Sequence, residues 1–189
     1  MEDIFDGLGL KRMPLVGLSY GAGVAIRPMS QAPERASRVA LVSPAGVVTG
    51  PIPRILARVA LPMLLYRLRA TRERLLRAAR PILTEPEAPA FGPAVRQLVA
   101  RSTDTSSWTP VCPGRPPEEL EGFGGPVAVS ASGEDVFFPG EAVLARAKEI
   151  VPNLALAECL KGCRHVPSEA AFGRVNVSIH AFLAGYVGA

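Results

Sequence analysis

The sequence predicts an α/β protein, in which a mostly parallel sheet is flanked by helices. Four short apolar runs are typical of buried parallel strands: 14–18, 37–43, 126–131 and 153–159. Near-helical spacing of apolar residues follows the first run, and helices are expected at 20–31, 140–151 and 168–185. Both halves of the chain therefore show the strand–helix–strand order of a right-handed crossover unit.

The first helix is expected to begin at Tyr20 and to stop before the sequence Ala-Pro-Glu-Arg at 32–35. Pro28 lies inside it. Proline has no N–H to bond the carbonyl of Val24, and its cost is ~3 kcal/mol if a helix continues through it. We therefore expect this helix to kink at Pro28 or to end early.

A segment of different composition separates the two halves. Residues 53–79 have the Arg and Leu spacing of an amphipathic helix, and a proline-rich stretch follows them. A connection of this length exceeds the usual crossover, which favours an α/β core of 1–48 and 126–189 with a lid inserted at 49–125. We expect the apolar residues of the lid helix to pack in a core, the alternative being an apolar acyl pocket: Leu61, Met63, Leu64, Leu65 and Leu68.

Composition and charge exclude several classes of protein. With 189 residues and 48% hydrophobic side chains, the chain is long and apolar enough for one packed core. The formal net charge is only +4, and we expect a solvated arginine face and no nucleic-acid partner. That face comprises Arg67, Arg69, Arg72, Arg74, Arg77 and Arg80.

The cysteines and the N-terminal residues indicate the compartment. The chain has an odd number of cysteines: Cys112, Cys159 and Cys163. A disulfide framework would use an even number, so a reducing, cytoplasmic location is favoured. Cys159, Cys163 and His165 supply only three ligands for a metal, so no metal site is predicted. The acidic start does not resemble a signal peptide, and the most apolar run, 55–66, is interrupted by Arg58 and Pro62, so no membrane span is expected.

The residues Gly17-Leu18-Ser19-Tyr20-Gly21 match G-x-S-x-G, the nucleophile elbow. In this motif a sharp strand-to-helix turn exposes a strained serine, and the flanking glycines are expected to avoid side-chain clashes. Ser19 lies where an apolar run gives way to a predicted helix, which is the context that the motif needs.

A serine nucleophile needs a base and a carboxylate to orient that base. His165 lies in a loop after the fourth predicted strand, so we expect it to be the base, whereas His180 lies inside the last helix and is expected to be structural. Asp135 follows the third strand at its carboxyl end and is the expected acid. Its competitor Glu134, like Asp135 itself, could instead be a helix cap or turn residue.

Four stretches of the chain together resemble α/β-hydrolase fold esterases and related bacterial hydrolases: LVGLSYGAGVAI, APERASRVALVSPAG, GPVAVSASGEDVFFPGE and LKGCRHVPSE. The order serine, aspartate, histidine is also that of this family. The resemblance implies Ser19 as nucleophile, Asp135 as acid, His165 as base and the Tyr20 backbone N–H as an oxyanion-hole donor. It implies a small ester or thioester substrate and no cofactor or metal, and a serine nucleophile disfavours the dehalogenases and epoxide hydrolases of the family.

Only 18 residues precede Ser19, whereas the family places several strands and a second oxyanion donor there. We therefore expect the C-terminal portion of the fold, with impaired activity. We also expect an open edge at 14–18 through which copies of the chain could form a homo-oligomer. The alternative is a degenerate, non-catalytic chain that acts as a binding or dimerisation module.

Overall fold

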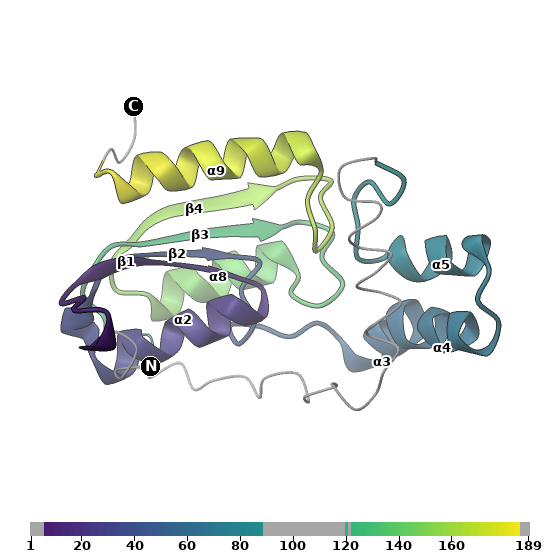
Figure 1. Cartoon of the computed structure of the whole chain (residues 1–189), viewed down its shortest axis with the longest axis horizontal. Coiled ribbons are helices and arrows are strands. Elements are labelled where there is room, and N and C mark those ends of the chain that lie inside the picture. The colour runs from purple at the N-terminus through teal and green to yellow at the C-terminus, as the bar shows by residue number, and fades with distance from the viewer. Residues whose placement is uncertain (1–5, 89–119, 121, 186–189) are drawn as a thin grey trace.

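The computed structural model describes residues 6–88, 120 and 122–185. In this part of the chain, four parallel strands form one sheet (Figure 1). Their order in the sheet follows the sequence: β1 (Met13–Leu18), β2 (Ala36–Val42), β3 (Val127–Ser132) and β4 (Leu154–Leu160). The predicted α/β class and parallel sheet are confirmed.

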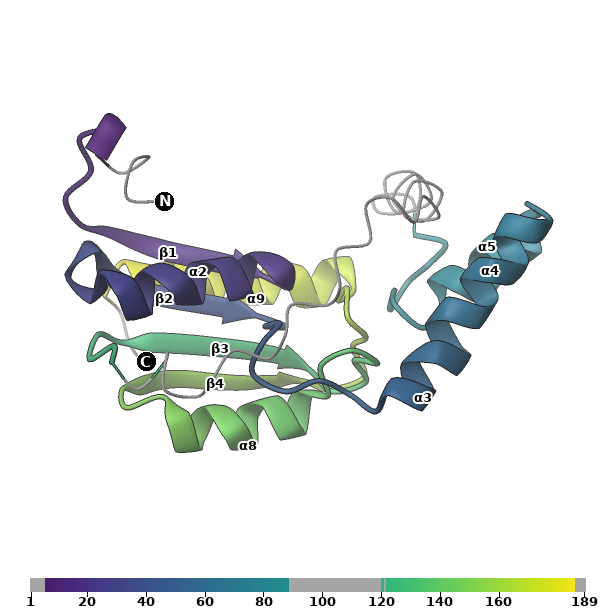
Figure 2. The same ribbon diagram turned by 90° about the horizontal axis from the view of Figure 1, so that it is seen from below.

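Helices cover both faces of the sheet. α2 (Tyr20–Gln31) and α8 (Gly140–Ile150) lie on one face, and α9 (Glu169–Leu183) lies on the other (Figures 1 and 2). One apolar cluster fills the space between the sheet and the first two helices, and a second lies under α9. The sheet is therefore the middle layer of three, and all its strands end at the same edge.

The helix α2 does not end early at Pro28, so of the two expected outcomes the early end is wrong. The helix continues through this position to Gln31. Ile26 and Met29 are fully buried in the cluster between α2 and the sheet. Burial of such side chains contributes ~1.5–3 kcal/mol each, which offsets the hydrogen bond that proline cannot make.

Beyond the carboxyl ends of the strands, residues 52–79 form a helical arm (Figures 1 and 2). Its elements are α3 (Ile52–Ile55), a π-helical turn (Leu56–Ala60), α4 (Leu61–Leu68) and α5 (Arg72–Ala79). The expected single helix over 53–79 is wrong, because the chain is extended at Arg69. Thr71 then caps α5 by accepting a hydrogen bond from the Arg74 N–H at 3.3 Å.

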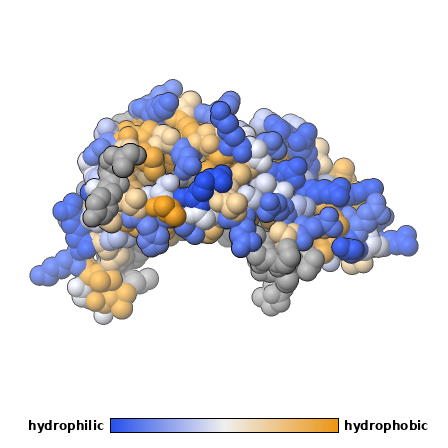
Figure 3. Space-filling view, turned by 90° about the horizontal axis from the view of Figure 1, so that it is seen from above, coloured by the Kyte–Doolittle hydropathy of each residue, from blue (hydrophilic) through white to orange (hydrophobic). Residues whose placement is uncertain are grey.

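Most leucines of the helical arm are exposed. Met63 is 8% exposed and packs with Val59 and Val136, but Leu64 is 52% and Leu68 is 73% exposed. Leu61 and Leu65 are exposed as well, so the expected core-packing role holds only for Met63. Hydrophilic side chains also gather over this end of the molecule, at the right of Figure 3. Among the arginines of the expected solvated face, Arg74 is partly buried and donates to the Leu65 carbonyl at 2.8 Å.

Within the described residues, β1 is an edge strand of the sheet. Val16 is 55% exposed and Leu18 is 48% exposed, because α9 packs against β2 and β3 rather than against β1. Cys159 and Cys163 are free thiols, and Cys112 lies outside the described residues. No helix in the described part of the chain is both long and apolar enough to cross a membrane.

Candidate active site

Ser19 occupies the turn between β1 and α2 in a left-handed conformation, with φ at 52°. This region costs a residue other than glycine ~1–3 kcal/mol, so the surrounding contacts must hold the turn. The Ser19 N–H donates to the Val42 carbonyl at 2.9 Å, and the Ser19 carbonyl accepts from the N–H groups of Ala22 and Ala45. The strained strand-to-helix turn required by the G-x-S-x-G motif is therefore present.

The two glycines of the motif differ in their steric surroundings. A Cβ added at Gly17 would lie 2.4 Å from the Ala22 Cα and 2.7 Å from the Gly21 carbonyl oxygen, both backbone atoms. A Cβ added at Gly21 would meet nothing within 4 Å. The expected clash is therefore found at Gly17 but is wrong for Gly21.

Gly17→Ala is expected to destabilise the fold by ~1–3 kcal/mol, because the backbone of the elbow must open to admit the methyl group. Gly21→Ala is the matched control. It lies in the first turn of α2, where alanine favours helix and the space is open, so its stability is expected to be equal or higher. Urea unfolding of the two variants and the wild type measures both effects. Equal destabilisation by both substitutions would contradict the steric argument.

The structure brings Ser19, His165 and Asp135 into one hydrogen-bonded chain. The Ser19 Oγ lies 2.8 Å from the His165 Nε2, and the His165 Nδ1 lies 2.7 Å from the Asp135 Oδ2. Ser19 follows β1, Asp135 follows β3 and His165 follows β4, so parallel strands deliver all three side chains to one edge of the sheet. With Nδ1 protonated, Nε2 is free to accept the serine proton.

The carboxylate of Asp135 is fully buried and is held by its neighbours in sequence. Its Oδ1 accepts the backbone N–H groups of Phe137 at 2.8 Å and Phe138 at 3.1 Å. Asp135 is thus also the turn residue that the sequence left as an alternative. Aspartate side chains commonly accept hydrogen bonds from backbone N–H groups that follow them in the chain. The sequence could therefore have indicated these N–H groups as partners of the Asp135 carboxylate.

Two aromatic rings that the sequence analysis did not single out contact the imidazole. The rings of Phe137 and Phe138 lie edge-on to His165, with centroids at 5.1 Å and 5.6 Å. The His165 side chain is only 12% exposed. Phe137 and Phe138 therefore shield the imidazole and restrict its plane, and only their position two and three residues after Asp135 hinted at this.

The competing residues lie outside this chain of hydrogen bonds. Glu134 is exposed, and its Oε2 lies 3.9 Å from the Arg164 Nε. His180 is exposed on α9. Among the described residues, no group of three or more His, Cys, Asp or Glu side chains is arranged to hold a metal ion.

The loop that carries His165 is hydrogen-bonded to residues 80–84, which follow the helical arm. The Val166 N–H donates to the Ile82 carbonyl at 2.8 Å, and the Thr84 N–H donates to the Val166 carbonyl at 3.0 Å. The Arg164 N–H donates to the Thr84 Oγ1 at 2.9 Å, and its guanidinium donates to the Arg80 carbonyl at 2.6 Å. These contacts help to fix the position of the loop that carries the imidazole.

Tyr20 is the first residue of α2, so its N–H has no partner within the helix. The positive end of the helix dipole lies at the same place, beside the Ser19 Oγ. A negatively charged oxygen near Ser19 would therefore be stabilised there.

No protein-family model matches the sequence. A stretch of 45 residues is 44% identical to carboxylesterase YbfK of Bacillus subtilis (strain 168), covering 24% of this chain and 15% of that protein. The solved structure of carboxylesterase CesB (YbfK) from Bacillus subtilis is similar over 98% of this chain and 64% of that chain, with a TM-score of 0.74 and 23% identity.

Two further solved structures are similar over nearly the whole chain. A serine hydrolase from Cycloclasticus zankles matches over 97% of this chain and 68% of its own, with a TM-score of 0.67 and 20% identity. The meta-cleavage product hydrolase CumD from Pseudomonas fluorescens IP01 matches over 96% of this chain and 68% of its own, with a TM-score of 0.72 and 17% identity. This chain thus spans 64–68% of the length of these three solved chains. From its layers, its serine turn and these likenesses, we conclude that the chain has the α/β-hydrolase fold.

Proposed function

We propose that the protein is a serine hydrolase that cleaves small carboxylic esters or related acyl compounds. The observation that carries this proposal is the chain of hydrogen bonds from Ser19 through His165 to Asp135, at 2.8 Å and 2.7 Å. The serine turn at φ 52° and the esterases among the structural neighbours support it. A serine hydroxyl is a weak nucleophile without such a base, so this geometry is what hydrolysis requires.

In the proposed mechanism, the Ser19 Oγ attacks the ester carbonyl carbon while the His165 Nε2 takes the hydroxyl proton. The carbonyl oxygen becomes negatively charged and accepts the Tyr20 N–H. Collapse of the tetrahedral intermediate breaks the ester bond, and His165 gives its proton to the leaving alkoxide. Water then attacks the acyl-serine by the same route, which releases the carboxylic acid and restores Ser19.

Asp135 holds the protonated Nδ1 of the imidazole and stabilises the imidazolium that forms in both steps. Its own position is fixed by the N–H groups of Phe137 and Phe138. The Tyr20 N–H is the oxyanion donor that we assign within the described residues. Loss of one such donor costs ~10²–10³ in turnover in a serine protease, so we expect this N–H to contribute strongly to the rate.

The test is labelling by a fluorophosphonate together with hydrolysis of a short-chain p-nitrophenyl ester. The wild type is expected to release p-nitrophenol and to gain one adduct, which mass spectrometry places on Ser19. Ser19→Ala is expected to do neither. Ser178→Ala, which removes a serine on α9 outside the hydrogen-bonded chain, is the matched control and is expected to behave as the wild type. A folded wild type that neither labels nor turns over would contradict the proposal.

The second candidate is a non-catalytic protein that binds a second copy of itself through β1. The exposed apolar side chains of Val16 and Leu18 at this edge favour it, since an uncovered strand edge offers unpaired backbone groups. The same experiment separates the two candidates, because only an activated serine reacts rapidly with a fluorophosphonate. Silence of the labelling experiment combined with a dimer in sedimentation analysis would favour the second.

A further inference from the structure

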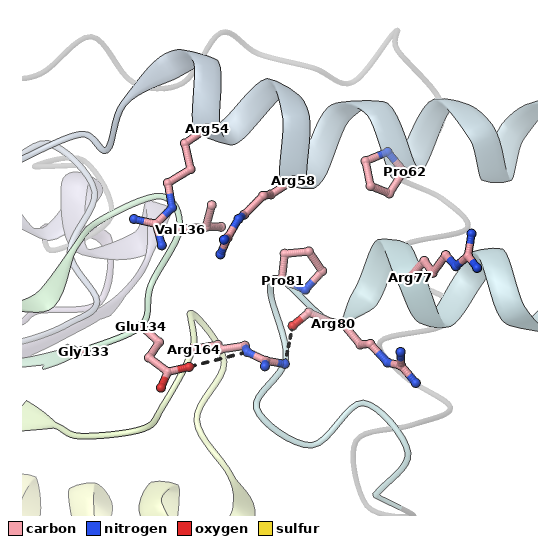
Figure 4. Close-up of a pocket in the computed structure, with 10 residues that line it drawn as sticks. All are labelled: Arg54, Arg58, Pro62, Arg77, Arg80, Pro81, Gly133, Glu134, Val136 and Arg164. Atoms are coloured by element: carbon pink, nitrogen blue, oxygen red, sulfur yellow. Dashed lines mark hydrogen bonds and ion pairs between the residues drawn. The ribbon is translucent and has the colours of Figure 1, made fainter.

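A cleft of about 680 Å³ lies between the helical arm and the loops that follow β3 and β4 (Figure 4). Its volume falls within the range of small-molecule sites, ~300–1,000 Å³. Ser19, Asp135 and His165 are not among its lining residues, but Glu134, Val136 and Arg164 adjoin Asp135 and His165 in sequence, so the cleft lies beside the proposed esterase site. Its charged lining consists of Arg54, Arg58, Arg77, Arg80, Arg164 and Glu134.

The arginines of the cleft come from separate parts of the chain. Arg54 and Arg58 belong to the first two turns of the helical arm, whereas Arg164 precedes His165 in the loop after β4. Figure 4 shows the side chains of Arg54 and Arg58 directed from the arm toward Val136 and Arg164, while Arg77 and Arg80 extend away from Arg164. Three arginine side chains from two parts of the chain therefore line one space, with the Arg164 guanidinium turned toward the Arg80 carbonyl.

These positive charges are only partly balanced within the described residues. Arg77 is paired with Glu73 at 2.8 Å. Arg164 donates to the Arg80 and Leu83 carbonyls, and its Nε lies 3.9 Å from Glu134. No ion pair to a described residue is formed by Arg54 or Arg58. Like charges at close range repel each other, so an anion bound between them would lower the energy of this arrangement.

We propose that this cleft binds the phosphate group of a small phosphorylated molecule, with Arg54, Arg58 and Arg164 as its ligands. The planar guanidinium donates paired hydrogen bonds that match the oxygens of a phosphate. A phosphate monoester carries two negative charges, which balances more of the unpaired charge than the single charge of a carboxylate does. The cleft volume leaves room for the organic part of the molecule beside Pro62 and Pro81.

A bound phosphate would bridge the helical arm and the loop of His165. On one side of the phosphate, Arg54 and Arg58 belong to the helical arm. On the other side, Arg164 belongs to the loop of His165, and its guanidinium donates to the carbonyls of Arg80 and Leu83. Binding would therefore reduce the motion of the arm relative to the core. This inference does not rest on the proposed hydrolase activity, because none of its ligands belongs to the chain of hydrogen bonds from Ser19 to Asp135.

Titration calorimetry with phenyl phosphate at low ionic strength tests the proposal. Arg54→Gln and Arg58→Gln are each expected to weaken binding about tenfold or more, since each removes a charge-assisted contact. Arg67→Gln is the matched control, because Arg67 is exposed on α4 and does not line the cleft. It removes the same charge from the same arm and is expected to change binding by less than about twofold.

Two further variants separate a built site from a general positive field. Arg58→Lys is expected to recover only part of the affinity lost in Arg58→Gln, because lysine is a point charge without the paired donors. Glu134→Gln is expected to tighten binding, because it removes the one carboxylate that lines the cleft. Ser19→Ala is expected to bind phenyl phosphate as the wild type does, so a failure of the hydrolase proposal leaves this result unchanged.

Several outcomes would overturn the proposal. These are the absence of binding to the wild type, an equal loss in Arg67→Gln and Arg58→Gln, and benzoate binding as tight as that of phenyl phosphate. Preference for a long single-stranded RNA, with a loss spread evenly over the arginines of the arm, would also overturn it in favour of a diffuse polyanion surface. Circular dichroism of each variant confirms that the compared proteins are folded.

Discussion

His165→Ala is expected to lower kcat on a p-nitrophenyl ester by ~10⁴–10⁶-fold, with a much smaller change in KM. The imidazole Nε2 lies 2.8 Å from the Ser19 Oγ, and without it the hydroxyl proton has no acceptor. Fluorophosphonate labelling of Ser19 is expected to slow in parallel, because it depends on the same activation of the serine. Steady-state kinetics and timed labelling measure the two effects independently.

His180→Ala is the matched control for this substitution. His180 is the chain's other histidine, and it is exposed on α9, so its removal is expected to leave kcat within about twofold of the wild type. If His180→Ala lost as much activity as His165→Ala, the assignment of the base would be wrong. A fully active His165→Ala would remove the basis of the proposed mechanism.

Asp135→Asn is expected to lower kcat by ~10⁴-fold while the fold stays intact. The amide oxygen of asparagine can still accept the N–H groups of Phe137 and Phe138, so the turn is retained. Its NH₂ group would then face the His165 Nδ1, which favours the tautomer protonated on Nε2. An imidazole protonated on Nε2 cannot accept the proton of Ser19.

Glu134→Gln is the matched control, since it makes the same change of charge at the adjacent position. Glu134 is exposed and does not contact His165, so kcat is expected to stay within about twofold of the wild type. Kinetics on both variants, with urea unfolding to compare their stabilities, distinguishes the two carboxylates. Equal loss in the two variants would mean that the general negative charge of this loop matters rather than the orientation of the imidazole.

The core of the fold could be predicted from the sequence because all four strands are short, mostly apolar runs, of which β2 and β3 are largely buried on both faces. Each strand of the described sheet begins and ends within one residue of the predicted apolar run. The helical arm was predicted less well. Leucines recur at helical spacing before and after the polar stretch 69–74, so their spacing alone does not reveal the extended conformation at Arg69 or the cap at Thr71. Periodicity also shows which side of a helix is apolar, but not whether another element covers that side, as the exposed Leu64 and Leu68 demonstrate.

For the candidate site, the positions of the residues at strand ends carried the prediction. Ser19, Asp135 and His165 each follow a strand of one parallel sheet, which brings them together whatever lies between them in sequence. The roles of these residues remain predictions that the variants above test. Arg54 and Arg58 could not be placed from the sequence, because their approach to Arg164 depends on how the arm lies against the core.

The hydrogen bonds between residues 80–84 and the loop of His165 set a limit on engineering this protein by exchange of segments. A graft that replaced everything between β2 and β3 would remove Thr84 and Ile82, and with them the anchors of Val166 and Arg164. A graft confined to α3, α4 and α5 would keep these anchors while changing the surface that the arm presents. Chimaeras should therefore be joined between Ala79 and Arg80, so that residues 80–84 remain with the native core and keep their hydrogen bonds to the loop of His165.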